Sequence, residues 1–353
     1  MDLMSKAIDL AKKGSGYTSP NPLVGAVLVK NGAVVGSGYH RKAGTDHAEI
    51  VALQRAGSHA RGATLYVNLE PCCHQGRTGP CTRALIAAGV KEIHCAMLDP
   101  NPQVRGRGKR ELEAAGIRVV VGEHREAAER LNEIFTRYIT TQQPFVLAKW
   151  AMSLDGTLTT RPGQSPWISS VASRRRVHQL RQRYDAILVG VNTVIADNPS
   201  LTVRYGVRRP AQPLRVIVDS TGRTPLNARV FYRQLPGKTL IATTTRMNKK
   251  KIQQYEKKGS QVLVVNAGSR VNLKMLLRRL GERGITGVMI EGGLTVLQAA
   301  FREHIVDKVT VFIAPKVMGS PQPGRAATPL LNHLAITGAE AIAGDVWITA
   351  YPA

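Results

Sequence analysis

The chain has 353 residues, of which 43% are hydrophobic and 5% aromatic, and its formal net charge is +25. This length suffices for two domains with full cores, and no apolar run reaches the roughly 20 residues that span a bilayer. Most of the positive excess lies in residues 145–353, which contain 30 Lys and Arg and 11 Asp and Glu. Residues 1–144 contain 19 Lys and Arg and 13 Asp and Glu. No aromatic residues alternate with the basic clusters, as they would in a surface on which nucleic-acid bases stack.

Residues 2–13 predict a mixed-charge amphipathic helix that ends at Gly14 and Gly16. It has no apolar signal core, so a cytoplasmic protein is expected. Four cysteines in a chain of this length do not form a disulfide framework. Cys95 is expected to be a small buried hydrophobe, and Cys73 is either that or a competing metal ligand.

The first half alternates strands and helices. A β-branched run at 23–29, an Asn31-Gly32 turn and residues 33–39 predict a hairpin. The next expected elements are a helix opened by His47, strand 63–69, helix 84–88, strand 92–97, helix 109–115, strand 117–121 and helix 126–138. This alternation predicts a layered α/β sheet. A polar segment that ends at Pro144 predicts a boundary between domains 1–143 and 144–353.

The second half continues in α/β style. Apolar runs predict strands at 145–149, 186–191, 214–219, 239–243, 261–265, 287–291 and 306–313. Helices are expected at 173–183, 249–258, 272–281 and 295–303, and antiparallel hairpins near the end. The basic runs 174–176 and 249–251 are either solvated faces or a means of attracting phosphorylated small molecules.

Three residues of the first half form a candidate metal site. His47, Cys72 and Cys81 are the donors that a catalytic zinc uses, with a fourth position left for water. Glu49 follows the histidine by two residues, where it can serve that water without binding the metal. H-x-E with P-C-x-x-C is the signature of zinc nucleobase deaminases, but here eight residues separate the two cysteines.

The predicted chemistry follows from these residue types. Zinc lowers the pKa of bound water to about 7, and the expected electrophile is a heterocyclic carbon that carries an exocyclic amine. Glu49 would move the water's proton to the ring nitrogen and then to the leaving ammonia. The alternative is a structural zinc with His74 or Cys73 as its fourth protein ligand.

A second candidate site lies late in the chain. No G-x-G-x-x-G follows any predicted strand, so the usual dinucleotide fingerprint is absent. Glu291-Gly292-Gly293-Leu294-Thr295 does stand between a predicted buried strand and a helix. Two glycines there allow a pyrophosphate to approach the helix N-terminus. The same residues also fit an ordinary turn.

Motifs along nearly the whole chain resemble the bacterial bifunctional deaminase/reductase family of riboflavin biosynthesis. In the first half they are Pro22-x-Val24-Gly25, Gly38-Tyr39-His40, Ala43-Gly44, His47-Ala48-Glu49, residues 68–81 with the long cysteine spacing, Asp99-Pro100-Asn101-Pro102 and Gly106-x-Gly108. In the second half they are residues 149–156, 165–169, 185–190, 197–204 and 218–220. The family usually has Pro where Gly79 stands and often Pro where Asp46 stands.

The resemblance implies a cytidine-deaminase-like three-layer N-terminal domain and a dihydrofolate-reductase-like α/β C-terminal domain. It implies one Zn²⁺ per chain and NADPH as cofactors. The implied substrate is 2,5-diamino-6-ribosylamino-4(3H)-pyrimidinone 5′-phosphate, which would lose its 2-amino group. Reduction of its ribosyl group would then give 5-amino-6-ribitylaminouracil 5′-phosphate. No nucleic-acid or membrane partner is expected, and a homo-oligomer, either dimer or tetramer, is expected.

The resemblance also assigns residues to sites. The implied substrate contacts are Asn21, His40, His74 and Arg77 in the first half and Ser165, Arg181, Leu201, Arg204 and Glu291 in the second. The implied NADPH contacts are Ala151, Trp167, Thr193, Asp197, Ser220, Gly293, Leu294, Thr295, Val296, Leu297, Gln298 and Ala299. Lys149 and Asp155 are candidates for supplying the proton of the reduction.

Several of these residues have a plainer interpretation. Asn21 also fits a turn between two prolines, and Arg77 a solvated charge. Lys149 and Asp155 also fit an ion pair or a turn cap, and Trp167 a core position. Arg181 and Arg204 are charge-assisted donors suited to a ribose phosphate.

Two rival functions follow from the same sequence. One is a nucleic-acid deaminase with a basic RNA-binding second domain, which predicts a short cysteine spacing and aromatic residues among the basic ones. The other is a non-catalytic scaffold stabilised by zinc, in which Glu49 would have no chemical role.

Overall fold

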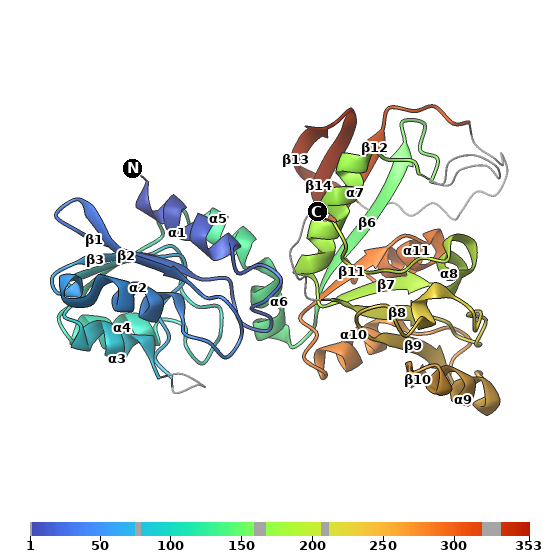
Figure 1. Cartoon of the computed structure of the whole chain (residues 1–353), viewed down its shortest axis with the longest axis horizontal. Coiled ribbons are helices and arrows are strands. Elements are labelled where there is room, and N and C mark those ends of the chain that lie inside the picture. Colours follow the sequence, from blue (N-terminus) through green and yellow to red (C-terminus); the bar gives the residue numbers. More distant parts are fainter. Residues whose placement is uncertain (1, 75–78, 159–166, 206–211, 320–332) are drawn as a thin grey trace. The chain divides into compact units, whose positions relative to one another are not determined.

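The computed structural model describes the chain except residues 1, 75–78, 159–166, 206–211 and 320–332. The chain forms two compact units, Met1–Gln142 and Gln143–Ala353 (Figure 1). The division lies one residue before the boundary expected from the polar segment. No helix among the described residues is long and apolar enough to cross a membrane.

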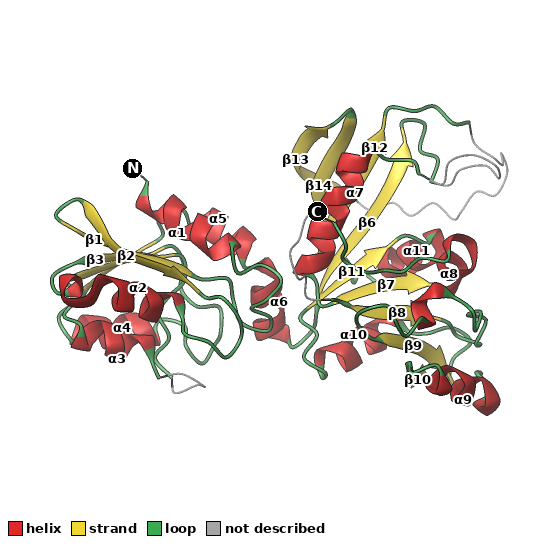
Figure 2. Cartoon of the chain, in the orientation of Figure 1, coloured by secondary structure: helices red, strands yellow, loops and turns green. Residues whose placement is uncertain are grey.

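The first unit has a five-stranded sheet, which lies between two layers of helices (Figure 2). Its elements are α1 (Leu3–Lys12), β1 (Gly25–Lys30), β2 (Ala33–Tyr39), α2 (Ala48–Ala56), η1 (Gly57–Ala60), β3 (Thr64–Val67), α3 (Cys81–Ala87), β4 (Glu92–Cys95), α4 (Arg107–Ala114), β5 (Arg118–Val121), α5 (Arg125–Leu131) and α6 (Glu133–Thr141). The strand order is β2-β1-β3-β4-β5. Helices α1 and α5 pack together on one face, and α2, α3 and α4 cover the other.

The expected hairpin is confirmed. β1 pairs antiparallel with β2, and Lys30 lies opposite Ala33. Asn31 and Gly32 both have positive φ, 50° and 75°, as a two-residue type I′ turn requires. β1 is almost wholly buried because helices cover both of its faces.

Two glycines of β2 allow α2 to lie directly on the sheet. A Cβ at Gly36 would be 2.3 Å from the carbonyl oxygen of Ala52, and one at Gly38 would be 2.6 Å from that of Ala48. A side chain at either position would therefore lift α2 from the sheet. This matters for function because α2 begins directly after His47 and carries Glu49.

The single helix expected at 126–138 is wrong, because the structure has two helices, α5 and α6, that meet at Asn132. The Asn132 side chain is buried and pairs with the backbone of Leu23, accepting its N–H at 2.8 Å and donating to its carbonyl at 3.0 Å. Helical periodicity alone does not reveal a contact 109 residues away.

The second unit is built on a nine-stranded sheet. Its elements are β6 (Phe145–Ser153), α7 (Val171–Arg183), β7 (Ala186–Gly190), α8 (Val191–Asp197), β8 (Leu214–Val218), η2 (Arg229–Phe231), β9 (Thr239–Thr244), α9 (Lys249–Lys257), β10 (Gln261–Asn266), α10 (Leu273–Gly281), β11 (Gly287–Glu291), α11 (Leu294–Arg302), β12 (Lys308–Ala314), β13 (Leu334–Ile342) and β14 (Asp345–Pro352). The first strand is four residues longer than expected, and the short helix α8 was not predicted.

The strand order is β10-β9-β8-β7-β11-β6-β12-β14-β13. Strands β10 through β12 in this order are parallel, and the antiparallel hairpin of β14 and β13 completes the edge. Chain order reverses at β7, because β8, β9 and β10 extend to one side while β11 and β6 lie on the other. In open parallel sheets, ligands bind at the carboxyl ends of strands beside such a reversal.

Candidate functional site

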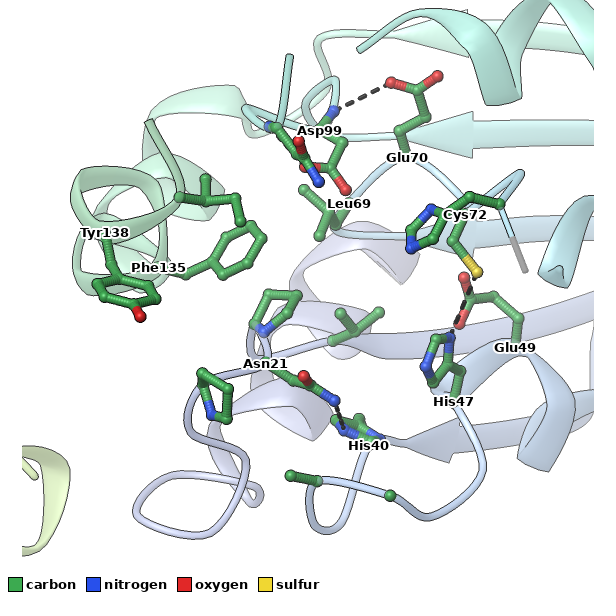
Figure 3. A pocket seen from close by; sticks show the side chains of 18 of the residues that line it. Asn21, His40, His47, Glu49, Leu69, Glu70, Cys72, Asp99, Phe135 and Tyr138 are labelled. Atoms are coloured by element: carbon green, nitrogen blue, oxygen red, sulfur yellow. Dashed lines mark hydrogen bonds between the residues drawn. The ribbon is translucent and has the colours of Figure 1, made fainter. Parts of the chain in front are cut away.

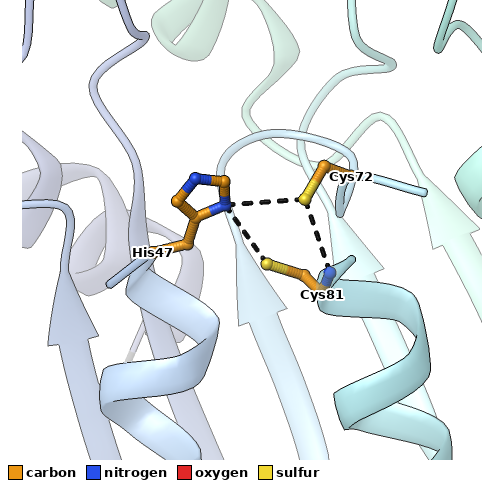
Figure 4. A group of neighbouring side chains, drawn as sticks. All are labelled: His47, Cys72 and Cys81. Carbon is orange, nitrogen blue, oxygen red and sulfur yellow. Dashed lines mark hydrogen bonds between the residues drawn. The ribbon is translucent and has the colours of Figure 1, made fainter. Parts of the chain in front are cut away.

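The three predicted metal ligands meet in the first unit (Figure 4). His47 is the N-cap of α2, Cys81 is the first residue of α3, and Cys72 lies in the loop after β3. The Nδ1 of His47 is 3.5 Å from Sγ of Cys72 and 3.3 Å from Sγ of Cys81. Tetrahedral zinc holds nitrogen and sulfur ligands about 3.5 Å apart, so this donor set fits the ion.

The two thiols of this cluster have opposite pKa shifts, and only Cys72 favours the ionised form that a metal requires. The pKa of Cys72 is lowered to about 4, mainly because its sulfur accepts a hydrogen bond from the Cys81 thiol. The same hydrogen bond raises the pKa of Cys81. The N–H of Cys81 also donates to Sγ of Cys72 at 3.4 Å. The hydrogen bond with Cys72 raises the pKa of His47.

Glu49 lies beside the cluster and is only 3% exposed. Burial, and then the neighbouring Cys72 charge, raise the pKa of its carboxyl to about 7. Its buried Oε2 accepts no hydrogen bond from any described residue. An acid–base group of this kind suits an enzyme that must both take and give a proton near neutral pH.

A cavity of about 420 Å³ opens onto the metal cluster (Figure 3). Its lining comes from the turn before β1, the loop before α2, the loops after β3 and β4, and helix α6. It includes the predicted residues Asn21, His40, His47, Glu49, Cys72 and His74. Arg77, the other predicted substrate contact of this half, lies outside the described residues.

Asn21 is oriented by the protein before any ligand arrives. His40 is 2% exposed, and its Nδ1 is 3.1 Å from the backbone carbonyl of Asp46, which can only accept a hydrogen bond. Nδ1 therefore carries the proton, and Nε2 accepts from the Asn21 amide nitrogen at 3.1 Å (Figure 3). Burial lowers the pKa of His40, consistent with a neutral ring.

Glu70 is a supporting residue that the sequence reasoning missed. Its carboxylate is 3% exposed and accepts three backbone N–H groups, those of Asp99 at 3.0 Å and of Gly106 and Lys109 at 2.9 Å. A Cβ at Gly108 would be 2.2 Å from the carbonyl oxygen of Pro71. The loop that leads into Cys72 is thus fixed against the start of α4.

The cavity also has an apolar wall that the sequence reasoning missed. Phe135, Tyr138 and Ile139 of α6 line it, and Figure 3 shows the first two. Their i, i+3, i+4 spacing marks one face of a helix, and that signal was visible in the sequence. Nothing in the spacing, however, says that this face borders a cavity.

The second unit has a buried charge cluster at the carboxyl end of β11 and the middle of β6. Glu291 lies directly opposite Lys149 in the parallel ladder, and Lys149 Nζ is 3.9 Å from its Oε1. Arg181 of α7 donates to Glu291 from Nε at 3.1 Å and from Nη2 at 2.5 Å. Burial lowers the pKa of Lys149, whereas Arg181 and Lys149 together outweigh burial and lower the pKa of Glu291.

The other predicted substrate contacts of this unit lie beside that cluster. Arg181 Nη1 donates to the carbonyl oxygen of Thr202 at 3.0 Å, which ties α7 to the segment of Leu201 and Arg204. Arg204 Nη1 donates to Oγ1 of Thr202 at 2.8 Å. Ser165 lies outside the described residues.

Predicted NADPH contacts gather where chain order reverses. Thr193 lies in α8, which follows β7, and Gly293 is the N-cap of α11, which follows β11. A Cβ at Gly293 would be 2.9 Å from Oγ1 of Thr193, so the two helix starts are in close contact. The remaining residues of that group occupy neighbouring elements: Leu294, Thr295, Val296, Leu297, Gln298 and Ala299 in α11, Asp197 at the end of α8, Ser220 after β8, and Ala151 in β6.

Trp167 and Asp155 make contacts that the sequence did not predict. Trp167 is 55% exposed, so the core alternative is wrong, and the Arg174 guanidinium lies 4.6 Å from its ring centroid. Asp155 accepts N–H groups of Met318 and Gly319, at 3.2 and 2.8 Å, and the hydroxyl of Ser153. The Ser153 hydrogen bond is the main cause of its lowered pKa.

Comparisons with known proteins agree with this architecture. Residues 1–97 match the cytidine and deoxycytidylate deaminase zinc-binding region, and residues 144–348 match the RibD C-terminal domain. The riboflavin biosynthesis protein RibD of Aquifex aeolicus is 49% identical over 316 residues, 90% of this chain and 87% of that protein. The RibD protein of Escherichia coli is 41% identical over 344 residues, 94% and 92% respectively.

Solved structures give the same result. Acinetobacter baumannii RibD superposes with a TM-score of 0.87 at 36% identity, covering 99% of this chain and 98% of that one. A diaminohydroxyphosphoribosylaminopyrimidine deaminase/5-amino-6-(5-phosphoribosylamino)uracil reductase of Thermotoga maritima superposes with a TM-score of 0.83 at 34% identity, covering 99% and 97%.

Proposed function

This chain belongs to the RibD family of bifunctional riboflavin-biosynthesis deaminase/reductases, and we propose that each activity resides in one of its two units. The deaminase is assigned to residues 1–143 and the reductase to residues 144–353. The division is supported by the two family matches, which fall on opposite sides of residue 143. It also agrees with the compactness of each unit.

The deaminase substrate is proposed to be 2,5-diamino-6-ribosylamino-4(3H)-pyrimidinone 5′-phosphate, the kind of compound named in the activity of the Thermotoga protein. His47, Cys72 and Cys81 would hold zinc, which supplies a Lewis acid and lowers the pKa of water. Glu49 would carry one proton from the attacking water to the ring nitrogen and a second proton, from the added hydroxyl, to the leaving amine. Its buried carboxylate, raised pKa and unpaired Oε2 support this role.

Binding of the pyrimidine is proposed to rest on the cavity residues. Asn21, held by His40, presents an amide of fixed orientation, and the α6 wall of Phe135, Tyr138 and Ile139 offers apolar surface to a planar ring. His74 borders the same cavity. Arg77 is retained as a proposed substrate contact because its positive charge suits a phosphate.

The substitution Glu49→Gln tests the deaminase assignment. It keeps size and removes proton transfer, so deamination should fall by about 10²–10⁴-fold while zinc content and NADPH-dependent reduction stay at wild-type levels. Zinc is measured by atomic absorption on the purified full chain. If deamination persists with zinc bound, Glu49 has no such role and the scaffold alternative is favoured.

The reductase is proposed to act around Lys149 in the middle of β6 and Glu291 at the carboxyl end of β11. NADPH, the cofactor of this family's reductase, supplies the hydride to C1′ of the ring-opened ribosyl group. Lys149, buried beside Glu291, is proposed to give the proton that completes the reduction. The Asp155 carboxylate already accepts backbone N–H groups of Met318 and Gly319. These contacts support the proposal that Asp155 holds that backbone in place and does not donate the proton.

The cofactor is proposed to lie along the meeting helix starts of α8 and α11. Gly293 through Ala299 and Thr193 would face the pyrophosphate and ribose, with Asp197 and Ser220 further along the same edge. Ala151 and the exposed Trp167 ring would border the nicotinamide. The strand-order reversal at β7 and β11 supports this placement.

The substitution Lys149→Met tests the reductase assignment. It keeps the length of the side chain and removes the proton donor, so reduction should be lost and deamination spared. NADPH binding, followed by its fluorescence, should be retained because Lys149 is not proposed to bind the cofactor. Equal loss of both activities would contradict the division of labour between the units.

The remaining proposals concern partners and location. A homo-oligomer, dimer or tetramer, is supported by β13, an edge strand of nine residues whose Ile336 is 64% exposed. Light scattering on the purified chain tests this, and a monomer would contradict it. The +19 charge of residues 145–353 is proposed to serve phosphorylated ligands and not nucleic acid. Thiolate ligands require a reducing compartment, which supports a cytoplasmic location.

A further inference from the structure

The segment that leads into α7 is fixed along its backbone by two residues from distant parts of the chain. Lys316, which follows β12, donates from Nζ to the carbonyl oxygens of Trp167 at 3.3 Å and of Ile168 at 2.8 Å. Asp345, the first residue of β14, accepts the N–H of Ser170 at 2.7 Å. All three contacts are made to the backbone, so they hold the path of the chain without setting the direction of the Trp167 ring.

Arg174, near the start of α7, contacts both the backbone of this segment and the Trp167 ring. Its Nη1 donates to the carbonyl oxygen of Ser169 at 2.7 Å. Its guanidinium carbon lies 4.6 Å from the centroid of the Trp167 ring, within the range of a cation–π interaction. Because the hydrogen bond fixes the guanidinium, the indole packs on a surface whose position is set.

That surface matters because the Trp167 side chain is 55% exposed. A buried ring is oriented by the close-packed core around it, whereas packing restrains a half-exposed ring much less. A side chain that is already ordered loses less conformational freedom when a ligand arrives, and the ligand binds more tightly as a result. A residue that orders Trp167 would therefore strengthen the binding of any ligand that the ring borders.

Arg176 makes the same kind of contact with a different tryptophan. Its guanidinium carbon lies 4.2 Å from the centroid of the Trp347 ring, in β14. Trp347 also stacks on Phe312, with 6.0 Å between the ring centroids and an interplanar angle of 7°. The Trp347 ring is thus held by a second aromatic side chain, and it is not among the proposed cofactor contacts. Arg176 is therefore a matched comparison for Arg174 on the same helix.

We infer that Arg174 is the positioning residue that orders the Trp167 ring for NADPH. This inference rests on the proposed reductase function, in which that ring borders the nicotinamide. Arg174 does not touch the cofactor. It acts by presenting a fixed cation to the indole, while Lys316 and Asp345 hold the backbone from which the ring departs.

Fluorine NMR tests the contact itself, without any cofactor. The chain has three tryptophans, Trp150, Trp167 and Trp347, so labelling with fluorotryptophan gives three resonances to assign. Arg174→Met removes the cation and its donors but keeps an unbranched stem, and it should shift the Trp167 resonance alone. Arg176→Met should shift the Trp347 resonance alone. A Trp167 resonance that stays in place in Arg174→Met would overturn the inference.

NADPH binding by the full chain tests the consequence of the contact. We expect Arg174→Met to raise the Kd for NADPH about five- to tenfold, the effect of losing one cation–π contact. Arg174→Lys keeps a positive charge and N–H donors, so it should recover most of the loss. Arg176→Met should bind NADPH as the wild type does. An equal rise in Kd in both Met variants would show a general effect of the helix and contradict the inference.

A double variant shows whether Arg174 acts through the ring. Trp167→Leu alone should also weaken NADPH binding, and adding Arg174→Met should weaken it no further. If the two losses multiply instead, Arg174 affects the cofactor by another route and the positioning role is wrong. A wild-type chain that fails to reduce the substrate would refute the proposed reductase together with this inference. Unchanged NADPH binding by Arg174→Met, when the wild type does reduce the substrate, would refute the inference alone.

Discussion

The Glu70 carboxylate provides a sharp test of how the metal loop is held. Glu70→Gln keeps the shape of the side chain but replaces one oxygen with an NH₂ group. In the wild type, Oε2 accepts the N–H groups of Asp99 and Gly106, and Oε1 accepts that of Lys109. The glutamine side chain has only one oxygen. Either the N–H groups of Asp99 and Gly106 or the N–H group of Lys109 would therefore face its NH₂ group, which is a donor and not an acceptor.

The magnitude follows from those contacts. One buried donor left unpaired costs about 1–3 kcal/mol, and each of the two remaining bonds loses about 1 kcal/mol when its acceptor becomes neutral. The expected loss is therefore about 3–5 kcal/mol out of a total stability of roughly 5–15 kcal/mol. For a unit of this size that is a fall in Tm of about 10 °C or more.

The assay is thermal inactivation of deamination, with NADPH-dependent reduction by the same chain as the internal reference. Glu113→Gln on α4 is the matched control, because that side chain is 44% exposed and, among the described residues, forms an ion pair with Lys109 alone. Deamination should be lost at lower temperature in Glu70→Gln, and reduction should be unaffected. If Glu70→Gln inactivates at the same temperature as the control, the bracing role assigned to Glu70 is refuted.

Two other predictions follow from buried polar groups. Asn132→Leu should destabilise the deaminase unit by about 1–3 kcal/mol, because the N–H of Leu23 loses its acceptor. The carbonyl of Leu23 still accepts a hydrogen bond from Asn68. An unchanged free energy of unfolding in denaturant would contradict this prediction. His178 takes up a proton below pH 6.5 when unfolded but only near pH 4 when folded, so the reductase unit should lose stability as the pH falls through this window. The loss should be about 2 kcal/mol at pH 5 relative to pH 8, and His178→Asn should abolish it; an equal loss in the variant would show that another group is responsible.

Sequence reasoning succeeded where one local pattern carried the information. The Asn31-Gly32 turn specified its hairpin, and the spacing of His47, Cys72 and Cys81 specified a metal cluster that the fold brings together. A helix start at His47 was predicted from the apolar residues that follow it and is confirmed, whereas the helix expected at 84–88 already begins at Cys81.

It failed where a residue's role depends on a distant partner. Asn132 breaks a helix because Leu23 needs its side chain, and Glu70 braces a loop through backbone groups about 30–40 residues further on. The hydrogen bonds of Arg181 to Glu291 and Thr202 also join residues far apart in the sequence. No periodicity or spacing encodes such contacts, because they arise only once the elements pack.

The most direct test of the whole account is the identity of the products. The purified chain is given the diaminopyrimidine ribosyl 5′-phosphate with and without NADPH, and the products are identified by mass spectrometry. Without NADPH, the product should have one amino group replaced by oxygen and no further change. With NADPH, it should also carry the mass of two added hydrogens. A substrate that keeps its amino group, or a product that gains no hydrogen when NADPH is present, would contradict the assignment of two sequential activities to this chain.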